Sequence, residues 1–201
     1  NILPGISLKD ENKQLENIID IAQENLDNAR RSVEKLNEDL SDLREVYDAQ
    51  DKEGLVLWNN AAAQLEENKR NVLRCEEARK KPYFGRIDFK DPKQKDEEVY
   101  YIGRVGIAKN ASEPVVIDWR APIASGYYEN SLGPCKYTVS SEGTFEIDLK
   151  RKRTYEIADD KLVDFFDSDV VANDELLTKY LAKNKKAVLG EIIATIQQEQ
   201  N

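Results

Sequence analysis

The sequence contains no histidine and no methionine, and it has only two cysteines, Cys75 and Cys135, among its 201 residues. Without histidine, most zinc sites and most catalytic triads or dyads are excluded. The two cysteines are far apart in the chain, which excludes a CxxC motif and favours a reducing, cytoplasmic setting. The missing initiator methionine indicates that these residues belong to a longer product.

The chain also lacks a long apolar run, so we expect neither a secretory signal nor a membrane span. Hydrophobic residues make up 40% of the sequence, charged residues 34%, and the mean hydropathy is −0.70. This composition predicts an elongated helical part joined to a smaller folded core. The formal charge of −9 predicts repulsion from nucleic acid at long range, so direct binding of DNA or RNA would need a local basic patch.

Two apolar stripes with helical spacing occupy the first 81 residues. The first stripe advances in alternating steps of four and three through Leu15, Ile19, Ala22, Leu26, Ala29, Val33, Leu36, Leu40, Leu43 and Tyr47. The second runs through Trp58, Ala61, Leu65, Val72 and Cys75, and it ends before Pro82. A polar turn around Gly54 separates them. The pattern predicts an antiparallel coiled-coil hairpin over residues 1–81, whose longer first helix packs elsewhere at its start.

Charge is distributed unevenly along this predicted hairpin. From Asp10 to Glu53 there are 14 acids and 6 bases, whereas from Glu66 to Lys81 there are 4 acids and 6 bases. The turn therefore carries acidic side chains, among them Asp48, Asp51 and Glu53. One interpretation is a solvated charged face. The other is an acidic tip that reaches into a basic or metal-containing cavity of a partner.

After Pro82 the apolar period changes from that of a helix to that of a strand. The predicted strands are Tyr83–Phe89, Val99–Ile107, Val115–Trp119, Lys136–Val139, Thr144–Leu149 and Arg153–Ile157. Short strands at this density predict a small β-barrel-like antiparallel module over residues 82–170. Helical patterns return over residues 171–201. The predicted class is thus α+β, with a long hairpin, a β module and C-terminal helices leading into a further domain.

The segment PVVIDWRAPIASG (residues 114–126) places an acid and a base within apolar sequence, where they are costly unless paired. Asp118 and Arg120 form either a ligand site or a structural charge pair. With no histidine and no phosphate-binding glycine loop nearby, we favour the structural pair, with Trp119 as a core or interface anchor.

The run Lys150-Arg151-Lys152-Arg153 is the only dense basic cluster. One interpretation is an edge strand protected by charge. The other is a contact with phosphate or with an acidic partner. No motif in the sequence builds a catalytic or metal site, because the paired carboxylates Asp159-Asp160 and those at 167–169 lie in predicted polar connections.

Five segments carry a resemblance to a known family: KPYFGRIDF (81–89), YYIGRVGI (100–107), VIDWRAPIASGYYE (116–129), GTFEIDLKRKR (143–153) and EIIATIQQEQN (191–201). Together they resemble the N-terminal region of the HelD family, superfamily 1 helicase-like proteins related to UvrD and Rep. The family implies binding to core bacterial RNA polymerase, with the coiled coil inserted into its secondary channel. It also implies an ATP-dependent motor that helps release the polymerase from nucleic acid. By position, the inserted tip would include Asp48, Asp51 and Glu53.

The resemblance also implies a nucleotide contact near the end of the chain. UvrD-like motors place a glutamine just upstream of their phosphate-binding loop, where its amide contacts the adenine of ATP. Gln200 is the matching residue here, while the ATP- and Mg²⁺-binding motifs would lie beyond Asn201. On this basis the fragment itself would not hydrolyse ATP. Two alternatives remain open: a nucleic-acid-gripping front end of a DNA helicase, and a non-enzymatic coiled-coil adaptor.

Overall fold

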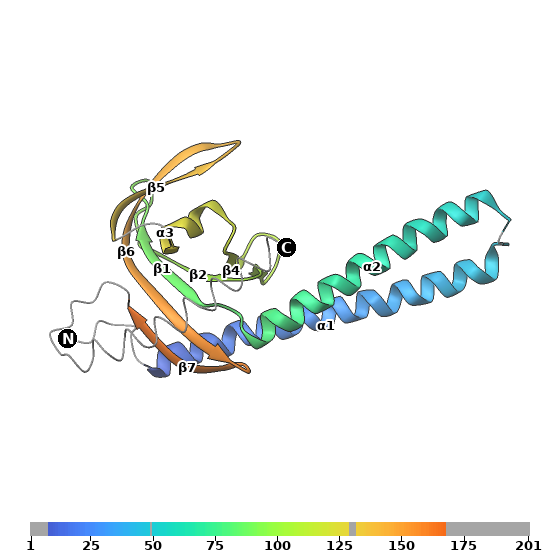
Figure 1. The fold of residues 1–201 in the computed structure, drawn as a ribbon, viewed down its shortest axis with the longest axis horizontal. Coiled ribbons are helices and arrows are strands. Elements are labelled where there is room, and N and C mark those ends of the chain that lie inside the picture. The colour runs from blue at the N-terminus through green and yellow to red at the C-terminus, as the bar shows by residue number, and fades with distance from the viewer. Residues whose placement is uncertain (1–7, 49, 129–131, 168–201) are drawn as a thin grey trace.

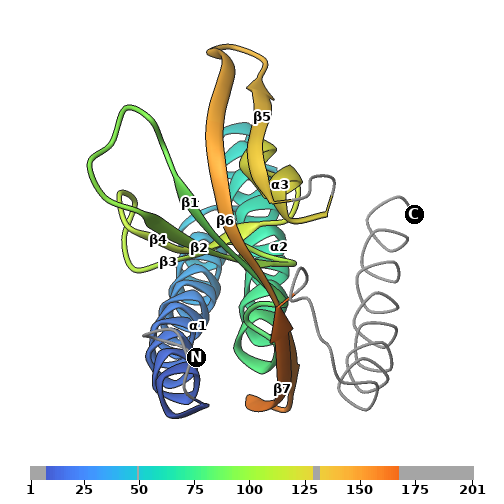
Figure 2. The same cartoon turned by 90° about the vertical axis from the view of Figure 1, so that its left-hand side faces the viewer.

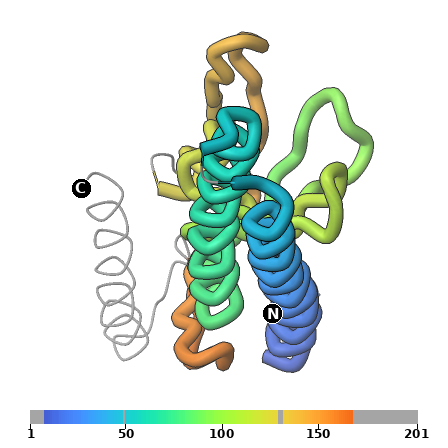
Figure 3. The backbone as a smooth tube through the Cα atoms, turned by 90° about the vertical axis from the view of Figure 1, so that its right-hand side faces the viewer, coloured from blue at the N-terminus to red at the C-terminus, as the bar shows by residue number. Residues whose placement is uncertain are grey.

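A computed structural model describes residues 8–48, 50–128 and 132–167. Two long helices, α1 (Leu8–Val46) and α2 (Lys52–Lys80), pack side by side as an antiparallel hairpin that extends away from a β-sheet (Figures 1 and 3). The 39 residues of α1 span about 58 Å at the rise of an α-helix. The predicted α+β class and the helical hairpin are confirmed. The C-terminal helices predicted over residues 171–201 lie outside the described residues.

The buried stripe of α1 follows the predicted seam along most of its length. Its buried members are Glu11, Leu15, Ile18, Ala22, Leu26, Ala29, Leu36 and Leu40. At the start of the helix, Ile18 is buried in place of the predicted Ile19, which is half-buried. The reason is that α1 packs there against the sheet as well as against α2, so a wider face of the helix is covered. The prediction that this start packs elsewhere is therefore confirmed.

The sheet has seven strands in the order β3-β4-β2-β1-β6-β5, and β7 pairs with β6. These strands are β1 (Gly85–Lys90), β2 (Glu98–Gly103), β3 (Ile107–Ala108), β4 (Pro114–Asp118), β5 (Gly133–Val139), β6 (Gly143–Ala158) and β7 (Lys161–Asp167). All of these pairings are antiparallel except that of β2 with β4. The sheet is curved, and β6 runs along its whole height (Figure 2).

Three strand predictions are wrong in detail. The segments Thr144–Leu149 and Arg153–Ile157 are one continuous 16-residue strand, β6, because the basic run between them keeps its pairing with β1. The segment Val99–Ile107 is two strands separated by a bend after Gly103. The strand β7 was missed, because the acids around it, Asp159, Asp160 and Asp167, indicated polar connections. It follows a tight turn in which Asp159 and Asp160 adopt positive φ angles of 48° and 59°, as a two-residue hairpin turn requires.

The sheet has an apolar core on each face, because successive residues of a strand point to opposite sides. On one face, the start of α1 covers a cluster that contains Tyr101 and Tyr155. On the other face, a 3-10 turn (η1, Pro122–Ala124) and the short helix α3 (Ser125–Tyr128) cover Ile87 and Ile102. The hairpin is thus anchored through α1 to one face of the sheet.

Candidate partner-binding tip

The turn of the hairpin is built by two aspartates. Asp51 is the N-cap of α2, and its carboxylate accepts hydrogen bonds from the backbone N–H groups of Glu53 and Gly54 at 3.0 and 3.4 Å. Asp48 accepts from the backbone N–H of Gln50 at 3.1 Å. The Asp51 bonds satisfy amide groups that the start of α2 leaves unpaired, and the Asp48 bond lies within the turn before it. Two of the three predicted tip acids therefore hold the turn together as well as carrying charge.

The two helices close on each other through Tyr47 and Gly54. A Cβ atom built on Gly54 would lie 2.5 Å from the Cβ of Tyr47, well inside any normal contact. Gly54 lies in the first turn of α2 and is buried. Glycine has a low helix propensity, so its presence in the helix needs a reason. The absence of a side chain at position 54 is thus what lets the tyrosine pack across the end of the hairpin.

The tip is strongly acidic, as the sequence predicted. Between positions 39 and 57 there are six acids and two bases, which gives a formal charge of −4. The structure brings Asp48, Asp51 and Glu53 together at the end of the hairpin, and all three are exposed.

The tip is also apolar, which sequence reasoning missed. Val46, Leu55, Val56 and Leu57 are exposed by 74%, 53%, 59% and 39%. The signal was the run Leu55-Val56-Leu57 at the start of α2, because a helix can turn only one of three consecutive residues fully toward its partner.

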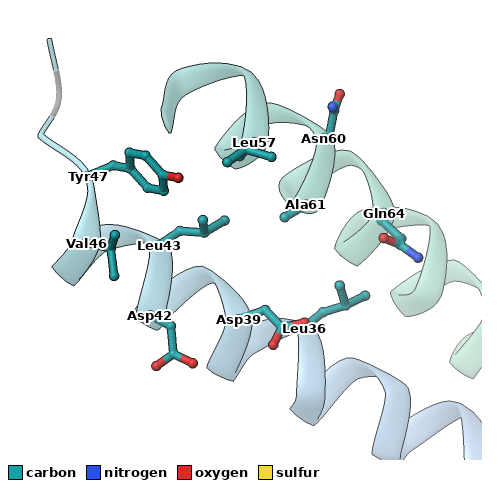
Figure 4. A pocket seen from close by; sticks show the side chains of 10 residues that line it. All are labelled: Leu36, Asp39, Asp42, Leu43, Val46, Tyr47, Leu57, Asn60, Ala61 and Gln64. Carbon is teal, nitrogen blue, oxygen red and sulfur yellow. The ribbon is translucent and has the colours of Figure 1, made fainter. Parts of the chain in front are cut away.

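Two grooves lie at the tip, and they share Leu43 and Tyr47. The first, of about 480 Å³, is lined by Leu36, Asp39, Asp42, Leu43, Val46, Tyr47, Leu57, Asn60, Ala61 and Gln64 (Figure 4). The second, of about 440 Å³, is lined by Leu43, Arg44, Tyr47, Asp48, Gly54, Leu55 and Trp58. In the second groove the Arg44 guanidinium lies 5.1 Å from the centre of the Trp58 ring, a cation–π contact.

The basic cluster does not form one surface. The interpretation of an edge strand fits residues 150–152 but not Arg153: β1 pairs along one side of β6, whereas on the other side the pairing with β5 ends at Leu149 and that with β7 begins at Arg153. Lys150 is exposed and pairs with Asp148 at 2.7 Å, whereas Arg151 is half-buried against Asp88 at 3.4 Å. Arg153 is completely buried. A contact with phosphate or an acidic partner therefore remains a prediction only for the side chains that reach the surface.

Arg153 belongs to a buried ionic cluster that sequence reasoning did not find. Its guanidinium donates two hydrogen bonds to Asp167, at 2.8 and 3.2 Å, and a third to Glu11 near the start of α1. Arg86 also donates to Glu11, at 3.2 Å, and the Tyr155 hydroxyl donates to the same oxygen at 3.0 Å.

Three acids and three arginines make up this cluster, which is therefore balanced in charge: Glu11, Asp88, Asp167, Arg86, Arg151 and Arg153. Burial lowers the pKa of Arg86, but its hydrogen bond to Asp88 and nearby negative charge outweigh that effect and hold the pKa above its usual range. The guanidinium thus stays charged. The cluster joins α1 to β1, β6 and β7, so it fixes the hairpin to the sheet.

The predicted pair of Asp118 and Arg120 is confirmed. Arg120 donates to the two carboxylate oxygens of Asp118 through Nε at 3.0 Å and Nη2 at 2.7 Å, and its backbone N–H donates at 2.8 Å. The pair lies at the end of β4 and is partly accessible to solvent, so its role is to shape the turn. Trp119 packs against the core on the face of the sheet that η1 and α3 cover. The Tyr128 hydroxyl donates a hydrogen bond to the backbone carbonyl of Trp119 at 2.9 Å.

Gln200, the predicted adenine contact, lies outside the described residues. Among the residues that are described, no cluster of three or more histidine, cysteine or acidic side chains has the arrangement of a metal site. None of the helices in the described ranges is long and apolar enough to cross a membrane.

The comparison with known families agrees with the resemblance seen in the sequence. The family described as the N-terminal domain of DNA helicase IV HelD matches residues 8–182. No curated protein matches the chain significantly. Because the family match covers both the hairpin and the sheet, the chain belongs to the HelD family and forms its N-terminal domain.

Proposed function

We propose that this domain docks an ATP-dependent, helicase-like motor onto bacterial RNA polymerase, with the hairpin inserted into the secondary channel of the enzyme. The motor would then help to release the polymerase from nucleic acid. The observation that supports the proposal is a hairpin anchored to the sheet through α1, whose tip, far from the sheet, has a formal charge of −4 over residues 39–57.

Electrostatics favour such a destination for the tip. A channel that leads to a catalytic Mg²⁺ site and contains basic residues attracts carboxylates and repels a basic tip. Exposed charges mainly affect the rate and the specificity of association, so Asp48, Asp51 and Glu53 would steer the hairpin into the channel. The ATP and Mg²⁺ that drive release would be bound by the motor domain, with Gln200 at the adenine.

A nucleic-acid-binding front end is the second candidate, because the matching family is described as a DNA helicase. In this case the exposed Lys150 would contact phosphates, together with the positively charged end of α2 next to the sheet, around Arg79 and Lys80. The net charge of −9 opposes this role, since a phosphate contact needs local positive charge to overcome repulsion.

Capture of purified core RNA polymerase tests the proposal. The chain should retain the polymerase, and a variant lacking residues 40–62 should not. A triple variant, Asp48→Asn, Asp51→Asn and Glu53→Gln, removes the tip charge, while the asparagine introduced at position 51 still caps α2. Its association should be slower, and the difference should shrink as salt is raised.

The matched control carries Glu16→Gln, Glu24→Gln and Glu34→Gln, three exposed acids of α1 away from the tip, with the same change in net charge. It should associate like the unaltered chain. Capture that survives the loss of residues 40–62 would refute the docking role of the hairpin. Absence of capture together with salt-dependent binding to duplex DNA would favour the second candidate.

A further inference from the structure

The apolar side chains at the tip are concentrated in one place. Ten large apolar side chains are exposed among the described residues, and four of them, Val46, Leu55, Val56 and Leu57, lie within twelve positions of each other around the turn. Single exposed apolar residues need no explanation, but several of them gathered around one turn indicate an interaction site. Charge alone therefore does not account for the surface that the tip presents.

Two of these four side chains, Val46 and Leu57, line the first groove. Figure 4 shows Leu43, Leu57 and Ala61 facing each other across the space between the helices, with Tyr47 at the end of the hairpin. Its volume of about 480 Å³ falls within the range of about 300–1,000 Å³ typical of binding pockets. Several apolar side chains of a partner can therefore enter it.

One rim of the groove is acidic. Asp39 and Asp42 lie on the α1 side, whereas the α2 side carries the neutral amides of Asn60 and Gln64 (Figure 4). Neither aspartate forms an ion pair with any residue in the described ranges. Arg44, a base that follows Asp42 in the chain, is engaged over Trp58 in the second groove. The acidic rim is thus available to a cation from outside the chain.

We infer that this groove binds an amphipathic protein segment with apolar side chains on one face and lysine or arginine beside them. The apolar residues enter between Leu43 and Leu57, and the base reaches Asp39 or Asp42. This is the helix-in-groove mode of recognition, with charge complementarity fixing the orientation. Nucleic acid is disfavoured as the occupant, because the tip and the phosphates are both negative. The inference rests on the proposed function in placing this segment within the polymerase.

The first test removes the apolar lining. A chain with Val46→Ser and Leu57→Ser should lose about tenfold in affinity for core polymerase, because both side chains are exposed and contribute to contact more than to folding. Leu73→Ser is the matched control, since Leu73 is 62% exposed on α2 outside the groove. It should bind normally. Equal affinity of the groove variant and the control would overturn the inference and leave the proposed function standing.

The second test does not depend on polymerase. The probe is a synthetic amphipathic helical peptide with leucines on one face and lysines beside them, and its counterpart carries glutamates in place of the lysines. Only the lysine peptide should shift the amide NMR signals around Val46, Leu57 and Ala61. Asp39→Asn with Asp42→Asn should remove that preference. Equal binding of both peptides, or binding of neither, would overturn the inference even if polymerase capture succeeds.

Discussion

The two ends of the hairpin differ in how they are packed. At the sheet end, Leu15, Ile18 and Ala22 are at most 3% exposed and lie in a core that includes residues from four strands. Toward the tip, the buried cluster shrinks to Leu36, Leu40 and Leu65, and only helix packs against helix. The comparison shows that the two ends of α1 have different structural roles. Its start is part of the body of the domain, while its end is a support for an exposed surface.

The acidic residues at the two ends also differ in burial and in their hydrogen-bond partners. At the sheet end, Glu11 is 1% exposed and accepts bonds from Arg153, Arg86 and Tyr155. At the tip, acids are exposed, and Asp48 and Asp51 accept bonds from the backbone N–H groups of the residues that follow them. A buried charge must be paired to be tolerated, whereas an exposed charge contributes little to stability and stays available to a partner. Substitutions at the two ends should therefore act on different properties.

The largest effect is expected from Arg153→Met. It leaves the buried Glu11 and the partly buried Asp167 without their main partner, which should lower the free energy of unfolding by about 3–5 kcal/mol. Urea unfolding followed by circular dichroism measures the loss. Lys150→Met, three positions away but exposed, is the control and should leave the midpoint unchanged. Similar midpoints for the two variants would show that the cluster does not stabilise the fold.

Next come two cavity-forming substitutions, one at each end. Ile102→Ala, in the sheet core, should lower the free energy of unfolding by about 4 kcal/mol, and Leu65→Ala, in the hairpin, by about 2 kcal/mol. Hydrogen exchange adds a sharper contrast. Ile102→Ala should speed exchange throughout the domain, whereas Leu65→Ala should speed it only in residues near the tip. If both variants sped up exchange throughout the domain, the hairpin and the sheet would unfold as one unit.

Two tyrosines on the anchored face provide a matched pair. Tyr155→Phe removes a donor to Glu11 and should cost about 1.5 kcal/mol of stability. Tyr83→Phe should cost nothing, because the buried Tyr83 hydroxyl has no hydrogen-bond partner among the described residues. Thermal unfolding at neutral pH compares the two variants. A larger loss for Tyr83→Phe would contradict the assigned bonding.

The same tyrosines predict a dependence on alkaline pH. Burial raises the pKa of both Tyr83 and Tyr155 in the folded protein above the ordinary value, which is about 10. Their contribution to stability is therefore complete below that pH and is lost as the pH rises, since only the unfolded chain releases the proton. The slope is about −1.4 kcal/mol per pH unit for each phenol. Tyr83→Phe should make the measured decline shallower.

The smallest effect is expected at the turn. Asp51→Ala removes the N-cap of α2 and should lower stability by about 1 kcal/mol, while Asp51→Asn should keep it. Both variants remove one tip charge, so polymerase association should slow equally in the two. Differential scanning calorimetry and binding kinetics separate the two roles. Equal stability of the variants would mean that Asp51 serves only as a charge.

The hairpin, its seam and its acidic turn could be predicted from the sequence, because helical periodicity and helix breaks are local patterns. The pair of Asp118 and Arg120 could also be predicted, since its members are two residues apart. The apolar tip was overlooked although Leu55, Val56 and Leu57 stand together in the sequence. Their exposure depends on which face α2 turns toward α1.

The ionic cluster could not be predicted in this way. Glu11 and Arg153 are 142 positions apart, and nothing in either local sequence distinguishes them from exposed charged residues. The continuity of β6 and the existence of β7 were hidden for a similar reason, since their charged residues find partners on other strands. Periodicity along a chain reports which face of an element is apolar. Which charges become buried is decided by long-range contacts, because only these supply the partners that offset the loss of hydration.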